Sequence, residues 1–171
     1  MTTEAVWKRG GSLLVALAVA LGGCAVKGSG KPFALRPPPA GEARVYHYRV
    51  HHTFLASALA WDVLSNGQPL TRIGNGGYFA ETVAPGRVRY LTRTNRDAGL
   101  YGIAATALSN ALADFQESHV LDAAADSTYF LRWRFDASMS DPVIEAMDPA
   151  TALSEMDGLL AFPPLTVDPD R

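Results

Sequence analysis

Three of the four histidines lie close together in the sequence, at His47, His51 and His52. Imidazole is the commonest metal ligand in proteins and a frequent general base. In a β-strand His51 and His52 would point to opposite faces, and His47 and His51 would stand about 13 Å apart. No His-Glu-X-X-His or Cys-X-X-Cys spacing supplies further ligands. The sequence therefore predicts no metal site, and we expect these histidines at the surface, at a strand end.

The residue types of a catalytic triad occur nearby, as Ser57 or Ser65 with His52 and Asp62. A serine nucleophile of the hydrolase type sits on a Gly-X-Ser-X-Gly turn, and this chain has none. Four further carboxylates are close together in the sequence: Asp136, Asp141, Glu145 and Asp148. They lack the spacing of an EF-hand calcium loop, and turns and helix caps account for them. We therefore expect a protein that is not an enzyme.

The glycine-rich stretch Gly74-Asn75-Gly76-Gly77 could be mistaken for a phosphate-binding loop. Such loops lead into a helix N-terminus, often with a lysine. Here a strand pattern follows, so the glycines indicate a turn and no cofactor is predicted.

Five arginines form the most distinctive polar pattern, because they alternate with apolar residues along two predicted strands. They are Arg87, Arg89 and Arg93 on the first strand and Arg132 and Arg134 on the second. If the two strands lie in one sheet, the arginines form a basic patch that suits an acidic partner or an anionic polymer. The alternative is a solvated face on which they pair with Glu81 and Glu145, which is ordinary for exposed strands.

The composition indicates one folded domain that does not bind nucleic acid. The chain has 171 residues and a net charge of −2, whereas nucleic-acid binding calls for a basic surface. Apolar and aromatic residues are too plentiful for a disordered chain. Cys24 is the only cysteine, so no disulfide can form within the chain.

Cys24 ends a segment with the features of an export signal. Lys8 and Arg9 precede the apolar run 13–21, which is too short to cross a bilayer as a helix. The run closes with Leu21-Gly22-Gly23-Cys24. This sequence resembles the lipobox of bacterial lipoproteins, which implies cleavage before Cys24 and acylation of its thiol. The alternative is an ordinary secretory signal.

Acylation of Cys24 would hold the chain on a membrane, because two or more acyl chains give a stable anchor. Residues 1–23 would be removed, and loss of Lys8, Arg9 and Glu4 takes the net charge from −2 to −3. In lipoproteins of the enterobacterial type, Asp after the cysteine signals retention in the inner membrane. Ala25 therefore favours the outer membrane, with the domain facing the periplasm.

Residues 24–41 are rich in glycine and proline, which predicts a tether that is flexible at 27–32 and stiff at 36–39. Fully extended, it would let the domain stand up to about 50 Å from the lipid. A docked N-terminal strand is the alternative, which the prolines disfavour because they lack backbone donors.

Residues 42–160 carry the pattern of a small antiparallel β-sandwich, with short strands joined by tight turns. We expect strands at 43–50, 60–64, 68–73, 78–83, 87–93, 119–121, 128–135 and 142–147. Asn66-Gly67 predicts a type I′ hairpin turn, and Pro69 predicts that its strand lies at a sheet edge. Residues 161–171 are predicted to be a flexible tail.

Two helices are predicted within this β pattern. Apolar residues at 99–115 recur at helical spacing and would either pack on the sheet or bind a partner. Asp148-Pro149 is typical of an N-cap followed by proline at the first helical position. This short helix would run to about residue 158, with Leu153 and Met156 turned inward.

Four motifs recur in the same order as in a known family. They are Ala43-Arg44-Val45-Tyr46, Asn75-Gly76-Gly77-Tyr78, Pro85-Gly86 and Thr128-Tyr129-Phe130-Leu131-Arg132. Together, over residues 40–147, they resemble a family of prokaryotic envelope lipoproteins known only as a domain of unknown function. The resemblance implies a compact sandwich of transthyretin-like or immunoglobulin-like type and no assigned catalytic residue. The chain departs from the pattern at 95–118, which is longer than usual, and at the turn 123–126.

These patterns predict a lipid-anchored protein of the bacterial cell envelope with one mainly β domain. The expected role is a non-enzymatic interaction or binding module, and the expected partner is an envelope protein or an anionic envelope polymer. The alternative is a lipoprotein that binds a small ligand or a metal on the periplasmic side. A hydrolase would require the serine, histidine and aspartate to converge in a cleft.

Overall fold

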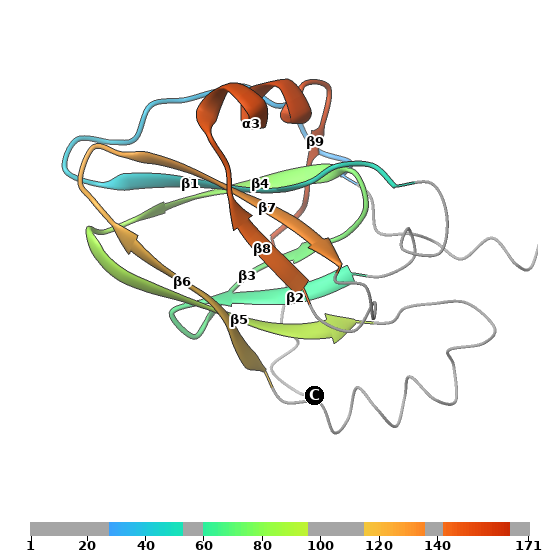
Figure 1. Ribbon diagram of the computed structural model, residues 1–171, viewed down its shortest axis with the longest axis horizontal. Helices are drawn as coiled ribbons and strands as arrows, with labels where there is room; N and C mark the ends of the chain where they lie inside the picture. The colour runs from blue at the N-terminus through green and yellow to red at the C-terminus, as the bar shows by residue number, and fades with distance from the viewer. Residues whose placement is uncertain (1–27, 53–59, 96–114, 136–141, 165–171) are drawn as a thin grey trace, which may run out of the picture.

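The computed structural model describes residues 28–52, 60–95, 115–135 and 142–164. In this part of the chain two β-sheets pack face to face, and a helix lies over the outer face of the larger sheet (Figure 1). The elements are β1 (Ala43–Arg49), β2 (Ala60–Ser65), β3 (Gln68–Ile73), β4 (Gly77–Val83), β5 (Gly86–Asn95), β6 (Gln116–Ala123), β7 (Thr128–Phe135), β8 (Pro142–Ala146), α3 (Pro149–Met156) and β9 (Leu160–Ala161). The prediction of a mainly β sandwich is confirmed.

The larger sheet has the strand order β8-β7-β1-β4-β9, and the smaller sheet has the order β3-β2-β5-β6. The smaller sheet is antiparallel, as predicted. The larger sheet is mixed, because β1 runs parallel to β7 and β4 runs parallel to β9. Parallel neighbours need a long crossover, and here the chain visits the other sheet between β1 and β7. The prediction of a purely antiparallel sandwich was wrong on this point.

The hairpin between β2 and β3 forms as its sequence predicts. Asn66 and Gly67 both have positive φ, at 48° and 80°, which a type I′ turn requires at its two central residues. β3 lies at the edge of its sheet, where the missing N–H of Pro69 costs least. The register of β2 and β3 shifts between Val63 and Leu64, at the point where Leu64 faces Pro69.

β1 is buried on both faces, because it is the central strand of a sheet that is covered on both sides. Its inward residues join the inter-sheet core, which consists of Ala43, Val45, Trp61, Val63, Ile73, Val83, Val88, Tyr90, Leu121, Ala123, Leu131, Trp133 and Phe162. Its outward residues join a second cluster, the outer core, which consists of Tyr46, Tyr48, Phe130, Ala152 and Met156. The outer core lies between the larger sheet and α3.

The helix α3 begins as predicted. The Asp148 side chain accepts a hydrogen bond from the Thr151 backbone N–H at 3.0 Å, and Pro149 follows the cap. Met156 is fully buried in the outer core, and Leu153 packs against it. The apolar side of the helix thus covers the outer face of the larger sheet.

The predicted tether and tail differ from the structure where it describes them. The Ser29 and Gly30 N–H groups donate to the Ala161 carbonyl at 3.1 and 3.0 Å, and Phe33 N–H donates to Leu159 at 2.9 Å. This part of the chain docks despite its prolines, because other residues supply the donors. At the other terminus Phe162 is buried in the inter-sheet core.

The lipobox with Cys24 and the predicted helix at 99–115, apart from its last residue, lie outside the described residues. Within those residues, no helix is both long enough and apolar enough to cross a membrane.

Candidate functional site

The five arginines of the predicted basic patch lie on two different sheets. β5, with Arg87, Arg89 and Arg93, belongs to the smaller sheet, and β7, with Arg132 and Arg134, belongs to the larger one. Both sets point away from the inter-sheet core, so they lie on opposite faces of the sandwich. The prediction of one patch was wrong, because strand alternation fixes the face of a residue but not the sheet that its strand joins.

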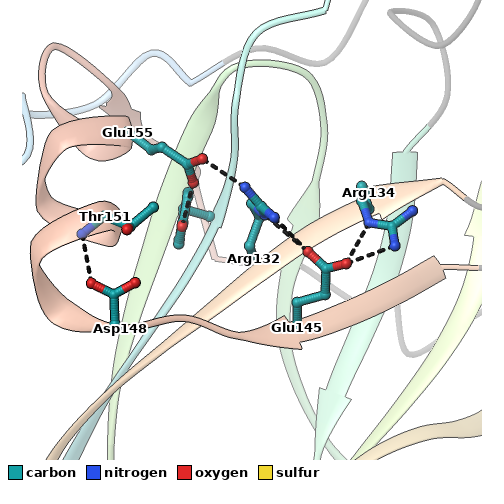
Figure 2. Close-up of polar contacts among 7 residues, drawn as sticks. Arg132, Arg134, Glu145, Asp148, Thr151 and Glu155 are labelled. Carbon is teal, nitrogen blue, oxygen red and sulfur yellow. Dashed lines mark hydrogen bonds and ion pairs between the residues drawn. The ribbon is translucent and has the colours of Figure 1, made fainter.

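On the larger sheet the arginines belong to a network of charged side chains at the junction of β7, β8 and α3 (Figure 2). Arg132 binds Glu155 of α3 at 2.6 Å and Glu145 of β8 at 2.7 Å. Arg134 binds the other oxygen of Glu145 at 2.6 Å, and the Tyr48 hydroxyl donates to Glu155 at 2.6 Å. We call these five residues the Arg132 network.

The network contains as many carboxylates as guanidinium groups, so each charge is compensated locally. Hydrogen bonds from Arg134 and Arg132 hold the pKa of the Glu145 carboxyl below its ordinary value. The hydrogen bond to Glu145 raises the pKa of Arg132. Burial and the neighbouring Glu155 raise the pKa of the Tyr48 hydroxyl. This arrangement ties α3 to the sheet and offers an anion little net positive charge.

On the smaller sheet the arginines also meet carboxylates. Arg89, whose side chain is 60 % exposed, pairs with Glu117 of β6. Arg93 binds Asp62 at 3.1 Å, and its guanidinium lies 4.8 Å from the Phe115 ring. Arg87 is exposed on the same face. The alternative stated above, in which the arginines pair with Glu81 and Glu145, is thus confirmed for Glu145. Glu81 instead contacts His47 and Tyr90.

Glu81 is the centre of a buried polar cluster between the sheets. Its carboxylate lies 3.0 Å from His47 Nε2 and accepts a hydrogen bond from the Tyr90 hydroxyl at 2.7 Å. Trp133 Nε1–H donates to His47 Nδ1 at 3.3 Å, so Nδ1 acts as the acceptor and Nε2 carries the proton given to Glu81. His47 is fully buried, and the prediction that it lies at the surface was wrong.

The electrostatics of this cluster favour an ionised Glu81. Burial alone would raise the pKa of its carboxyl, but hydrogen bonds from His47, Tyr90 and Ser65 outweigh burial and lower that pKa. Burial and the Glu81 charge raise the pKa of the Tyr90 hydroxyl. The cluster therefore stabilises the packed sheets, with its donors and acceptors directed at one another. The sequence held one signal for this cluster: His47 is two residues from Val45, so both side chains point to the same face of the strand.

A second buried charge, Arg49, was not recognised in the sequence. Its side chain is fully buried, with the guanidinium carbon 5.2 Å from the Trp61 ring centroid and 4.8 Å from that of Phe135. Burial lowers its pKa to about 10. This cation–π cluster joins β1, β2 and β7 at one end of the sandwich.

The family model that matches the chain, over residues 39–150, is described as Protein of unknown function (DUF2846). This chain belongs to that family. The resemblance to a domain of unknown function is thereby confirmed, whereas its envelope-lipoprotein part remains a prediction. Searches of curated proteins and of solved structures find no significant match.

Two of the residues weighed above for a catalytic triad, Asp62 and His52, make other contacts in the DUF2846 domain. Both carboxylate oxygens of Asp62 are bound by Arg72 and Arg93. The backbone N–H and C=O of His52 are bound by the Asn75 side chain at 2.8 and 2.9 Å. Ser57 lies outside the described residues. Asp62 is thus paired with two arginines, and the backbone of His52 is held by Asn75.

The histidines and carboxylates weighed above as metal ligands lie apart in the DUF2846 domain, where the structure describes them. His51 and His52 are exposed at the end of β1, as expected. Asp148 caps α3, Glu145 belongs to the Arg132 network, and Asp136 and Asp141 lie outside the described residues. Within the described ranges, no three His, Cys, Asp or Glu side chains are placed to hold a metal ion.

Proposed function

We propose that this protein is a lipid-anchored component of the bacterial cell envelope whose DUF2846 domain is a non-enzymatic interaction module. The observation that carries the anchor is Leu21-Gly22-Gly23-Cys24 after a basic and then an apolar segment. Acyl chains on Cys24 would keep the domain at the outer membrane, facing the periplasm.

The use of charged side chains supports an interaction role over catalysis. The Arg132 network, the Glu81 cluster and the Asp62 pairs direct their polar atoms at one another, as structural networks do. The domain is thereby a stable sandwich with two separate outer faces, one on each sheet. Arg87 and Arg89 are exposed on one face, and Arg134, whose side chain is 46 % exposed, lies on the other.

The anchor is tested by metabolic labelling with palmitate followed by membrane fractionation. The wild-type chain should incorporate the label and float with the outer membrane, and Cys24→Ser should do neither. The matched control adds Ser29→Cys to Cys24→Ser, which returns a thiol without the lipobox and should not restore labelling. Label on the Cys24→Ser chain, or a soluble wild-type protein, would refute the anchor.

The interaction role is tested by in-cell cross-linking of the acylated protein, with one charge reversal on each face. Arg89→Glu and Arg134→Glu should differ, because only one face is expected to meet the acidic protein or anionic polymer. The matched controls are Arg89→Lys and Arg134→Lys, which keep the charge. Equal cross-linking in all four variants would exclude both arginine faces. A thermal shift with a small molecule or metal ion would then favour the ligand-binding alternative.

A further inference from the structure

We propose that residues 28–36, which we call the strap, hold one end of the sandwich close to Cys24, so that this end faces the membrane. The claim that this end faces the membrane rests on the lipid anchor proposed above. The claim that the strap is docked does not depend on that anchor. The domain would then stand against the bilayer in a fixed orientation.

The strap is bound to the domain by backbone and ring contacts. In addition to the three bonds from Ser29, Gly30 and Phe33, Ala161 N–H donates to the Lys31 carbonyl at 2.9 Å. The Phe33 ring packs edge-on against Tyr46 and Tyr78, with centroids 5.5 and 5.4 Å apart. Figure 1 shows this first described part of the chain, in blue, beside β9 and α3.

The glycines of the strap are required by its close approach to β9. A Cβ atom on Gly28 would lie 2.2 Å from the Leu160 carbonyl oxygen. A Cβ on Gly30 would lie 2.9 Å from the Cβ of Ala161. Both separations are shorter than real side chains tolerate, so any other residue would push the strap off the strand. The glycines that resemble a flexible linker in the sequence are thus a packing requirement.

The strap begins at a defined end of the sandwich. Leu160, which the strap contacts, pairs with Gly77 at the start of β4, and Gly77 pairs with Arg49 at the end of β1. The Arg49 guanidinium in turn lies over Phe135, the last residue of β7. We call this the near end. Ala43 and Val83, paired with each other at the opposite ends of β1 and β4, mark the far end.

Chain length limits how far the near end can stand from the anchor. Gly28 follows Cys24 by four residues, which span at most about 14 Å whatever their conformation. A strand of seven residues, such as β4, is about 23 Å long, so the far end lies well beyond that reach. Leu160, an apolar side chain that is 37 % exposed, lies at the near end. A docked strap therefore replaces a spacer of about 50 Å with a short link.

The docking is measured first by hydrogen exchange on the acylated protein in nanodiscs. The amides of Ser29, Gly30 and Phe33 should be protected in the wild type and exposed in the double variant Gly28→Val/Gly30→Val. The matched control is Ser29→Val, whose exposed side chain is free to change and which should keep the protection. Protection of β2 and β5 amides in every variant shows that the domain is folded. Unprotected strap amides in the wild type would overturn the proposal.

The orientation is measured with lipids that carry a nitroxide headgroup in the same nanodiscs. Amide signals of His51, Gly77 and Leu160 should broaden more than those of Gly41 and Gly86. Insertion of ten Gly/Ser residues before Gly28 should keep strap protection but abolish this difference, because it adds about 17 Å of mean reach. Equal broadening of both ends in the acylated wild type would overturn the proposal and leave the anchor intact.

An absent anchor gives a different result. If Cys24 carries no acyl chain, its free thiol takes a nitroxide label, and a docked strap should still broaden near-end signals more than far-end signals. That outcome would refute the membrane anchor and the membrane-facing end while confirming the docked strap.

Discussion

The two faces of the five-stranded sheet are covered by different parts of the chain. The inner face packs on the second sheet, and every residue of the inter-sheet core except Phe162 lies within the family match at 39–150. The outer face is covered by Ala152, Met156 and Phe33, all outside that match. The matched domain thus supplies all of the inter-sheet core but Phe162, and only the sheet side of the outer core.

This difference suggests that the inter-sheet core and the outer core contribute differently to stability. The inter-sheet core is enclosed by two sheets that contain most of the described residues, and it buries two tryptophans and a polar cluster. The outer core is closed by one short helix and the strap, which adjoins the proposed anchor. The first layer should therefore set global stability, and the second should be able to open alone.

The largest expected effect is that of Trp133→Ala in the inter-sheet core. Trp133 is fully buried against Trp61 and His47, so its truncation should lower the free energy of unfolding by about 3–5 kcal/mol. Urea denaturation measures the loss, and Trp133→Phe, which keeps most of the apolar volume, should cost less. A loss below about 1 kcal/mol would show that this core can collapse around the gap.

The corresponding change in the outer core is Met156→Ala. It should cost about 2–3 kcal/mol, in the lower part of the usual range, because this layer has a single helix to readjust. Hydrogen exchange should show α3 and the strap opening while β2 and β5 stay protected. Equal loss of protection in both layers would mean that the domain unfolds as one cooperative unit. The outer core would then not open independently of the inter-sheet core.

Local chemistry accounts for what the sequence could predict. The Asn66-Gly67 turn, the edge position of Pro69 and the Asp148 cap depend on a few adjacent residues, and all three are confirmed. In each case the physical cause lies within a few residues of the feature in the sequence, where sequence patterns are most informative.

The candidate site depended on contacts that local patterns do not contain. Whether Arg89 and Arg132 share a sheet is decided by the crossover that pairs β1 with β7. The burial of His47 follows from a central strand covered on both faces. The shared face of His47 and Val45 is a signal for one buried face, but no pattern within β1 shows that both faces are covered. The strap was predicted to be a linker, because Gly28 and Gly30 suit a flexible chain and a close backbone approach equally well.

A smaller effect is expected from Glu81→Gln, which removes the charge of the inter-sheet polar cluster and keeps its shape. The folded pKa of Glu81 lies below its ordinary value of 4.5, so its charge adds stability above that value and the stability is lost as pH falls through the folded pKa. The variant should lose about 1–2 kcal/mol at pH 7, and the difference should shrink in acid. Urea titrations across pH measure both. Glu117→Gln, which alters an exposed pair, should change stability by less than about 0.5 kcal/mol at either pH.

The smallest effect on stability is expected from the Arg132 network, which borders the outer core. A double-mutant cycle of Arg132→Met and Glu155→Gln should give a coupling energy of about 0.5–1 kcal/mol, because both side chains are about one quarter exposed and solvent screens the pair. The coupling should weaken as salt is added, whereas the Met156→Ala loss should not. A coupling of zero would mean that the Arg132–Glu155 pair does not help to hold α3 on the sheet. A salt-dependent coupling would instead make the Arg132 network a second attachment for the layer that carries the strap. Ionic strength would then influence how firmly α3 and the strap stay on the sheet.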